Sequence, residues 1–306
     1  MEYLKLGASL YVPATHKELI NIAKGLKYPG LKSLIIDTED SITTDDLPFA
    51  YENIGKLLQE LSNSPLEGGA RGMLFDSPLR PMVFIRVRNT KEYQRLSDFE
   101  NIKNIDGFVL PKFTLENMED YLKVNLPNKY IMPILEKDIF NPGNIEKIRD
   151  FLLPHKERVL SVRVGATDLL SSLGLRRDCQ TCIYEIGIMN QIITNIVIAF
   201  KPFGFNITGP VWESFDEESR EKLQNEVKLD LLNGLFGKSI IHPWQIDVVE
   251  EMYKVKKEDY ETAQKILEPY SPAVFKLYNR MNEKATHSSW AKNIVEMAKI
   301  YGIREY

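Results

Sequence analysis

The stretch LKSLIIDTEDSI, residues 31–42, begins as a short apolar segment and ends in three carboxylates, Asp37, Glu39 and Asp40. A short apolar run of this kind is typical of a buried strand. Carboxylates this close together repel one another, and burying them is costly unless a cation neutralises their charge. The stretch therefore predicts either a solvated strand end or a site that handles cations or protons.

The same arrangement, an apolar run followed by polar residues, occurs throughout the chain. The predicted strands cover residues 8–13, 31–37, 81–87, 105–112, 130–136, 159–165, 204–211 and 238–243. Helical patterns lie between them, for example at 16–26, 50–61, 184–200 and 217–232. Short strands that alternate with helices are typical of βαβ units and a parallel sheet.

Eight such units in about 245 residues match the size of a TIM (β/α)8 barrel. We predict an α/β fold with this barrel over residues 1–245 and a C-terminal helical extension over 246–306. A doubly wound open sheet is the alternative, but the first strand–helix turn, VPATHKE, lacks a glycine-rich phosphate loop. The stretch SNSPLEGGARGM, residues 62–73, is predicted to be a surface loop.

Composition excludes several classes of partner. The 306 residues are 43% hydrophobic and 27% charged, with a net charge of −4, so no general basic field attracts nucleic acid or an anionic membrane. The N-terminus lacks the pattern of a signal peptide, and no apolar run is long enough to span a bilayer, so we expect a cytoplasmic protein. Cys179 and Cys182 form CQTC without a second ligand pair, so we expect ordinary reduced thiols.

In a barrel of this kind the active site lies at the C-terminal ends of the strands. A polar side chain at any single strand end is ordinary, but here most of the strands have one. The polar residues at these predicted ends are Asp37, Glu39, Asp40, Arg86, Arg88, Lys112, Glu136, Asp168 and His242. Their coincidence across six strands indicates a functional site.

Glu136 and Asp168 follow the fifth and sixth predicted strands, which are neighbours in a barrel. Two carboxylates on adjacent strand ends can share Mg²⁺, which prefers oxygen ligands, whereas zinc would find only His242 as a nitrogen ligand. The guanidinium of Arg86 suits a substrate carboxylate. Glu39 and Asp40 could hold metal-bound waters, orient Arg86 or move a proton.

Seven motifs at these positions resemble, in the same order, those of the citrate lyase beta-subunit family, which is grouped with the HpcH/HpaI-type aldolases and the malyl-CoA lyases. They are YVPATH, DTEDSI, IRVRN, LPKF, ILEKD, VGATDLLSSLG and GKSIIHPWQI. The resemblance runs from the first strand to about residue 267. The whole chain looks closest to a subgroup of lyase-like proteins associated with tellurite-resistance and stress gene clusters.

The resemblance implies a Mg²⁺-dependent carbon–carbon lyase, usually oligomeric and often trimeric, that acts on acyl thioesters. It implies that Glu136 and Asp168 bind Mg²⁺, that Arg86 binds the carboxylate of an oxo acid, and that Glu39 and Asp40 complete the site. The chain departs from the family pattern at Ala14, which replaces a glycine, at Arg88, which replaces an asparagine, and at strand seven, which lacks an acidic end residue.

Coenzyme A, as part of a thioester substrate, would bring several phosphate charges that need a local basic cluster. Lys112, Arg176 and Arg177 are the candidates for this cluster, whereas Lys238 begins the eighth predicted strand and should lie at the opposite end of the barrel. Two alternatives stay open. One is an aldolase that acts on a free hydroxy-oxo acid without coenzyme A, and the other is a non-catalytic ligand-binding subunit.

Overall fold

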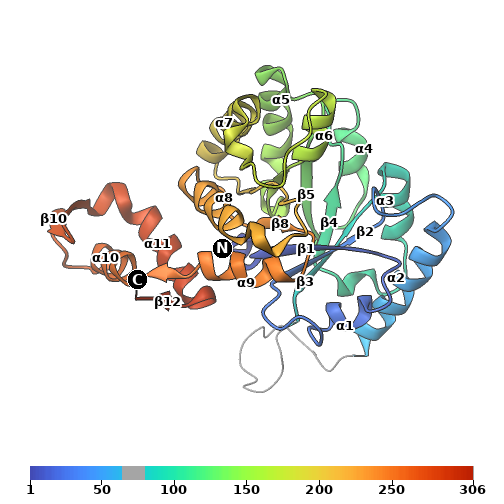
Figure 1. Ribbon diagram of the computed structural model, residues 1–306, viewed down its shortest axis with the longest axis horizontal. Coiled ribbons are helices and arrows are strands. Elements are labelled where there is room, and N and C mark those ends of the chain that lie inside the picture. Colours follow the sequence, from blue (N-terminus) through green and yellow to red (C-terminus); the bar gives the residue numbers. More distant parts are fainter. Residues whose placement is uncertain (64–79, 306) are drawn as a thin grey trace.

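Eight parallel strands form the centre of the computed structural model, which describes residues 1–63 and 80–305 (Figure 1). The strands are β1 (Ala8–Pro13), β2 (Ser33–Asp37), β3 (Met82–Arg86), β4 (Gly107–Leu110), β5 (Tyr130–Leu135), β6 (Val162–Val164), β7 (Ile207–Thr208) and β8 (Lys238–Ile240). They pair in the order β7-β6-β5-β4-β3-β2-β1-β8, and a parallel bridge between Gly209 and Lys238 joins the two ends. The predicted (β/α)8 barrel is confirmed, and the open sheet does not apply.

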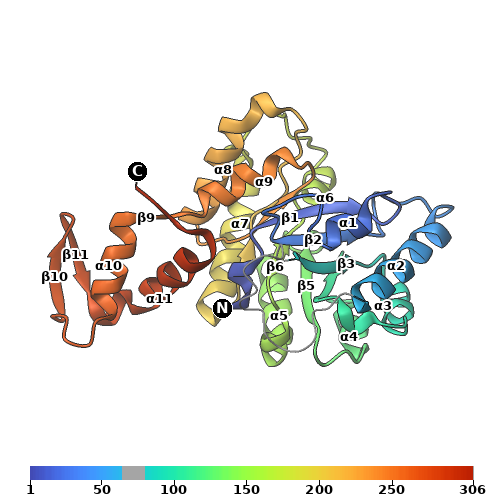
Figure 2. The same cartoon turned by 90° about the horizontal axis from the view of Figure 1, so that it is seen from below.

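Helices surround these strands (Figures 1 and 2). They are α1 (Leu19–Ala23), α2 (Leu47–Ser62), α3 (Thr90–Ser97), α4 (Met118–Lys123), α5 (Pro142–Leu152), α6 (Ala166–Ser172), α7 (Gly187–Phe200), α8 (Arg220–Leu232) and α9 (Trp244–Met252). In the described part of the chain, no helix combines the length and apolarity that crossing a bilayer requires. The predicted surface loop at 62–73 lies, from residue 64 onward, outside the described residues.

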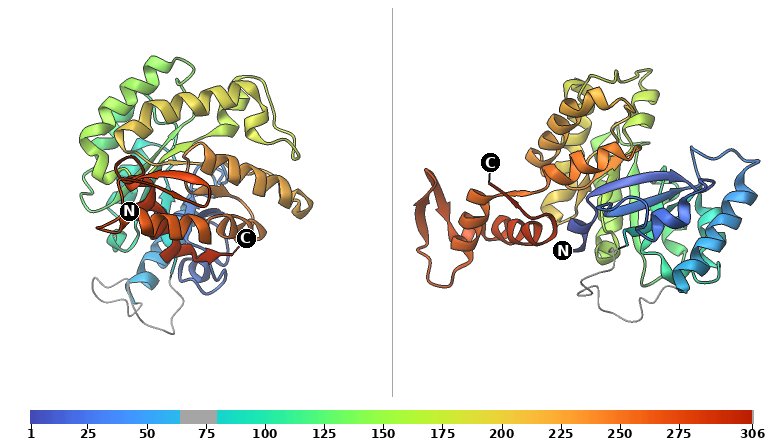
Figure 3. Two further views of the ribbon diagram at one scale, coloured as in Figure 1. Left: turned by 90° about the vertical axis from the view of Figure 1, so that its left-hand side faces the viewer. Right: turned by 60° about the horizontal axis from the view of Figure 1, so that its bottom comes forward.

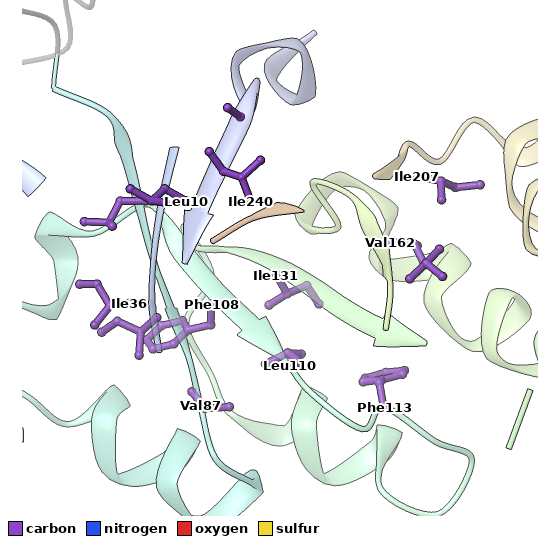
Figure 4. Packing of buried hydrophobic residues seen from close by; sticks show 14 of the residues in the cluster. Leu10, Ile36, Val87, Phe108, Leu110, Phe113, Ile131, Val162, Ile207 and Ile240 are labelled. Carbon is purple, nitrogen blue, oxygen red and sulfur yellow. The ribbon is translucent and has the colours of Figure 1, made fainter. Parts of the chain in front are cut away.

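Side chains that point away from the barrel axis pack against the helices. Figure 4 shows part of this layer, in which Leu10, Ile36, Phe108 and Val162 come from four different strands. All four are buried. Burying an apolar side chain of this size contributes about 1.5–3 kcal/mol, so this layer is the main support of the fold.

Alternate residues of each strand point into the barrel, where they form a second, smaller core. Ile35 of β2 and Phe84 of β3 belong to this inner core. Because side chains alternate with a period of two, the next inward positions along β2 and β3 are Asp37 and Arg86. On β5 the same count places Glu136 directly after the strand on the inner side. The strands therefore carry apolar residues in the barrel interior and charged residues at its C-terminal mouth.

The C-terminal part differs from the predicted helical extension. After α9, which packs on β1 and α8, the chain forms a mixed unit that projects from the barrel (Figures 1 and 3). It consists of β9 (Val255–Lys256), α10 (Lys257–Leu267), β10 (Val274–Leu277), β11 (Arg280–Glu283), α11 (Lys284–Tyr301) and β12 (Ile303–Arg304). The hairpin β10–β11 turns through Tyr278 and Asn279, both in left-handed conformations, as tight hairpins require.

This unit is anchored at the end of the barrel opposite the charged mouth. The hydroxyl of Tyr301 donates to the carbonyl of Leu4, just before β1. The ring of Tyr301 also packs edge-on against Phe236, just before β8, with ring centroids 5.8 Å apart. The predicted boundary at 245/246 falls inside α9, which belongs structurally to the barrel.

Candidate active site

A cavity of about 580 Å³ opens at the C-terminal ends of the barrel strands. Its walls include Tyr11 of β1, Asp37 of β2, Arg86 of β3, Glu136 after β5 and Asp168 in the first turn of α6. The fold thus brings together side chains that lie more than a hundred residues apart in the sequence. We use the name rim cluster for seven charged residues at this mouth, which are Asp37, Glu39, Asp40, Arg86, Lys112, Glu136 and Asp168. Two further charged residues, Glu213 after β7 and Arg163 on β6, also line the cavity.

Asp37 organises the turn that follows β2. Its Oδ1 accepts a hydrogen bond from the backbone N–H of Glu39 at 2.9 Å, and its Oδ2 accepts one from the N–H of Ser41 at 3.2 Å. The hydroxyl of Thr38 donates to the carbonyl of Arg86 at 2.7 Å and ties the turn to β3. Asp37 is buried and structural, and the turn it forms presents Asp40 to the cavity.

Arg86 is held by three carboxylates. Its Nε and Nη2 donate to the two oxygens of Asp37 at 2.6 and 2.7 Å, and its Nη1 lies 3.0 Å from Glu39 and 3.1 Å from Asp40. Burial raises the pKa of Asp37, but the bonds and charge of Arg86 outweigh it and lower that pKa below the ordinary value. The side of the guanidinium that we expected to bind a substrate carboxylate is therefore occupied by Asp37.

Lys112 also turns toward the rim cluster. Its amine bonds to Glu39 and lies 3.5 Å from Asp40, so its charge is matched inside the protein. Its backbone has a φ of 48°, a left-handed conformation that costs a side-chain-bearing residue about 1–2 kcal/mol. In this conformation its N–H donates to Oε1 of Glu136 at 2.6 Å. This geometry differs from a lysine that reaches outward for phosphate.

Glu136 and Asp168 form the part of the rim cluster that lacks a cation. Glu136 is 2% exposed, and burial together with the charge of Asp168 raises its pKa to about 8. In residues 1–63 and 80–305 neither carboxylate makes an ion pair. Gly165 makes room for this pair, since a Cβ there would lie 2.2 Å from Oε2 of Glu136.

The oxygen donors of this pair fit a hard divalent cation, which commonly takes one or two protein carboxylates and completes its shell with water and substrate. The described residues contain no group of three or more acidic, histidine or cysteine side chains that could hold a metal by themselves. The fit therefore favours a cation that is shared with a substrate over a closed structural site.

Arg177 corrects one of our expectations. Its side chain is only 3% exposed, and it donates to Glu226 at 2.9 Å and to the carbonyl of Val211 at 2.7 Å. Its guanidinium also lies 5.0 Å from the ring centre of Trp212. Arg177 is therefore structural and does not offer its charge to a phosphate. Arg176, the preceding residue, is exposed and lines a neighbouring hollow of about 940 Å³.

The same buried contacts continue to β8. Lys238, which begins β8 as predicted, bonds to Glu226 at 2.7 Å and to Asp230 at 2.9 Å, and the hydroxyl of Tyr184 donates to Asp230 at 2.7 Å. We call Arg177, Tyr184, Glu226, Asp230 and Lys238 the outer network, because its acids come from α8, on the outside of the barrel. This network is buried, and Arg177 connects it to the cavity wall, because its Nε lies 3.4 Å from Glu213.

Two other candidates have structural positions. His242 lies beside Phe215, with ring centroids 5.9 Å apart, and does not line the cavity. Arg88 donates to the carbonyl of Ile42 at 3.0 Å and so supports the turn after β2. Cys179 and Cys182 are free thiols, as expected.

Sequence reasoning missed Arg163, which lines the floor of the cavity although it is 1% exposed. A usable signal was present in the sixth strand. Val162 and Val164 point outward into the layer under the helices, so the residue between them must point into the barrel. A charged residue at an inward position of a buried strand marks a functional candidate.

The barrel and its charged mouth define this chain as a TIM-barrel protein with an enzyme-like site at the strand ends. A family model described as C-C bond lyase of the TIM-barrel fold matches residues 1–303. The chain belongs to this family, and it is an enzyme of the carbon–carbon lyase class.

Named relatives agree with this family. The chain is 20% identical over 268 residues to a (3S)-malyl-CoA thioesterase of Cereibacter sphaeroides, a match that covers 86% of this chain and 82% of the relative. It is 22% identical over 301 residues to the mitochondrial citramalyl-CoA lyase of Mus musculus, covering 93% and 80% of the two chains.

Among solved structures, the chain is similar to the protein CitE of Mycobacterium tuberculosis, which was crystallised with magnesium, acetoacetate and coenzyme A. The TM-score is 0.65 at 21% identity, with 96% of this chain and 98% of that chain covered. At this identity the likeness supports the barrel fold. Together with the family match, it confirms the expected resemblance to citrate lyase beta-subunit-like proteins.

Proposed function

We propose that this enzyme is a Mg²⁺-dependent lyase of the citrate lyase beta-subunit type. It would cleave a hydroxy-acyl substrate into an oxo acid and an acyl product. The observation that carries the proposal is the pair Glu136 and Asp168, two carboxylates that line the cavity at the mouth of the barrel and make no ion pair among the described residues. When bound there, Mg²⁺ would supply positive charge next to the oxygen on which negative charge develops as the carbon–carbon bond breaks.

The residues of the chain would divide the remaining work. Asp40 lines the cavity and keeps a partly exposed carboxylate, so we propose that it accepts the proton of the substrate hydroxyl. Glu39 is less suited to this task because it is buried and does not line the cavity. Arg86 would then orient this base, because its Nη1 lies 3.1 Å from Asp40 while Asp37 keeps the guanidinium in place.

The acyl group is proposed to be carried as a coenzyme A or carrier thioester. The relatives named as malyl-CoA thioesterase and citramalyl-CoA lyase, and the CitE structure with coenzyme A, support this proposal. One observation favours the alternative, an aldolase that acts on a free hydroxy-oxo acid. Of the three basic residues expected to meet the phosphates, Arg177 is buried and Lys112 is paired with Glu39, which leaves only Arg176.

Calorimetric titration with Mg²⁺, for the wild type and for Glu136→Gln and Asp168→Asn, tests the metal site. We expect each variant to bind Mg²⁺ at least about tenfold more weakly, because each loses one of two charged ligands. Lys137→Gln, which changes an exposed neighbouring charge, is the control and should bind normally. Undiminished binding in the double variant would refute the site.

A second titration distinguishes the two substrate classes. Free coenzyme A or acetyl-CoA should bind the Mg²⁺-loaded enzyme and weaken as salt is added, because exposed charges are screened. Binding of an oxo acid without any binding of coenzyme A at low salt would favour the free-acid aldolase.

The finer parts of the resemblance are also proposals. We propose that the protein is related to the lyase-like group associated with tellurite-resistance gene clusters and that it is cytoplasmic. We also propose that it forms a homo-oligomer, which is often a trimer in this family. Sedimentation analysis of the purified chain tests the oligomeric state directly, and a monomer at micromolar concentration would refute it.

A further inference from the structure

Arg163 is the charged residue at the floor of the cavity, and its surroundings differ from those of every other arginine at the mouth. It lies on β6 opposite Ile134 of β5, one inward position below the level of Glu136 and Gly165. The residue is 1% exposed and still lines the cavity. Its guanidinium therefore faces the cavity from inside the barrel, beneath the Glu136–Asp168 pair.

Its contacts are neutral. Nη2 donates to the hydroxyl of Ser239 at 2.7 Å, and Nη1 lies 3.6 Å from the sulfur of Met132. The guanidinium carbon lies 5.5 Å from the ring centre of Tyr11. The buried Nε has no hydrogen-bond partner. Within the described residues, Arg163 has no carboxylate within ion-pair distance, whereas Arg86 has three.

Burying a guanidinium without an anion is costly, because the charge loses its hydration and regains little from neutral groups. Methionine or leucine would fill the same place in the inner core without this cost. A bound anion would supply the missing partner of the guanidinium and would explain why an arginine occupies this position. Arginine presents a planar fork of donors that matches the two oxygens of a carboxylate.

We propose that Arg163, with Ser239, receives a carboxylate of the substrate at the floor of the cavity. This inference rests on the proposed lyase function and assigns the recognition of the oxo-acid carboxylate to Arg163, because Asp37 already occupies the corresponding side of Arg86. The substrate would enter with its anionic end pointing down into the barrel and its hydroxyl or oxo group beside Glu136, Asp168 and Asp40. The substrate class is then an oxo acid or hydroxy acid with a free carboxylate at this end.

The test compares the wild type with Arg163→Met and Arg163→Lys in the full-length protein. Methionine keeps much of the side-chain volume beside Met132 and removes the charge. We measure Mg²⁺ binding, then the binding of pyruvate and oxaloacetate to the Mg²⁺-loaded protein, and the melting temperature without ligand. Methyl pyruvate, in which a methyl ester replaces the carboxylate, serves as the uncharged analogue.

We expect Arg163→Met to bind Mg²⁺ normally, to melt no lower than the wild type, and to bind both acids about 10- to 100-fold more weakly. It should lose the preference for pyruvate over methyl pyruvate. Arg163→Lys should recover part of the affinity, because it restores charge but not the planar fork. This partial recovery can be measured even when the methionine variant does not fold.

Three results would overturn the inference. Equal binding of both acids by wild type and Arg163→Met would remove Arg163 from substrate recognition while leaving the proposed function intact. A lower melting temperature with unchanged acid binding would assign Arg163 a structural role. Wild-type protein that binds Mg²⁺ but neither acid would instead refute the proposed function together with this inference.

Discussion

The rim cluster and the outer network both consist of acidic and basic side chains. They differ in how closely the number of carboxylates matches the number of cations. In the outer network, two carboxylates, Glu226 and Asp230, meet two cations, Arg177 and Lys238, and all four side chains are at most 3% exposed. In the rim cluster, five carboxylates face only two cations, Arg86 and Lys112, and the side chains of Asp40 and Lys112 are 57% and 30% exposed.

The difference separates a structural cluster from a functional one. A buried set of matched charges has no remaining demand for a ligand, and removing one member leaves its partner unpaired. A set with excess negative charge beside a cavity still attracts a cation. Burial, and then the charge of Asp168, raises the pKa of Glu136, and the charge of Lys112 does not offset these two effects. Balance and access, more than the number of charged residues, distinguish the two clusters.

The largest effect on this comparison should come from Lys238→Met. The change leaves Glu226 and Asp230 buried without their shared cation, which should cost about 3–5 kcal/mol in the free energy of unfolding. Urea denaturation measures it. Lys254→Met, which removes an exposed partner of Glu251, is the control and should cost less than about 1 kcal/mol. A similar small cost for both variants would show that the outer network is not what holds this side of the barrel.

Arg86→Lys should lower the free energy of unfolding by about 1.5–3 kcal/mol, because lysine cannot make two parallel bonds to Asp37. Denaturation and oxo-acid binding are measured on the same preparation. Arg88→Lys, which changes a guanidinium bonded to a backbone carbonyl, is the matched control and should lose less. Full stability combined with lost acid binding would contradict this expectation and return the substrate carboxylate to Arg86.

Magnesium binding should depend on pH through Glu136. Its pKa is about 8 in the folded protein, so below that pH the metal must displace a proton. Affinity should rise up to about tenfold per pH unit between pH 6 and 8 and then level off. Without metal, the stability of the protein should fall over the same range, because the unfolded chain releases this proton more readily.

Calorimetry at several pH values measures this dependence, and Glu136→Gln supplies the control. The variant should bind Mg²⁺ weakly at every pH. Without metal, its stability should not show the decrease between pH 6 and 8 that Glu136 causes in the wild type. A Mg²⁺ affinity that is constant from pH 6 to 8 in the wild type would show that Glu136 is already ionised when the metal arrives.

The smallest effect is expected for Arg176→Ala, which should change the free energy of unfolding by no more than about 0.5 kcal/mol, because the side chain is exposed. Arg177→Ala, one residue away, should be clearly destabilising because it removes a cation from the outer network. If the substrate is a thioester, Arg176→Ala should weaken coenzyme A binding several-fold at low salt. Equal destabilisation by the two changes would contradict the assignment of Arg177 to the outer network and of Arg176 to the exposed surface.

The number and order of the barrel strands, and the gathering of polar residues at their C-terminal ends, followed from the sequence. Apolar runs that alternate with helices define parallel units, and in any such barrel the strand ends converge on one face. Asp37, Arg86, Glu136 and Asp168 could be placed there without coordinates, because each lies at the end of a predicted strand or shortly after it. The alternation of side chains along a strand, with a period of two, would have been sufficient to find Arg163.

Only the tertiary structure decided which of these charges meet. Arg177 and Arg176 are adjacent in sequence, yet one is buried against Glu226 and the other is exposed, since Glu226 arrives from a helix 49 residues away. Lys112 could reach outward, but its left-handed backbone and Glu39 turn it inward. The reason is physical: the local pattern determines the backbone path, whereas long flexible side chains settle on partners that the fold supplies from distant parts of the chain.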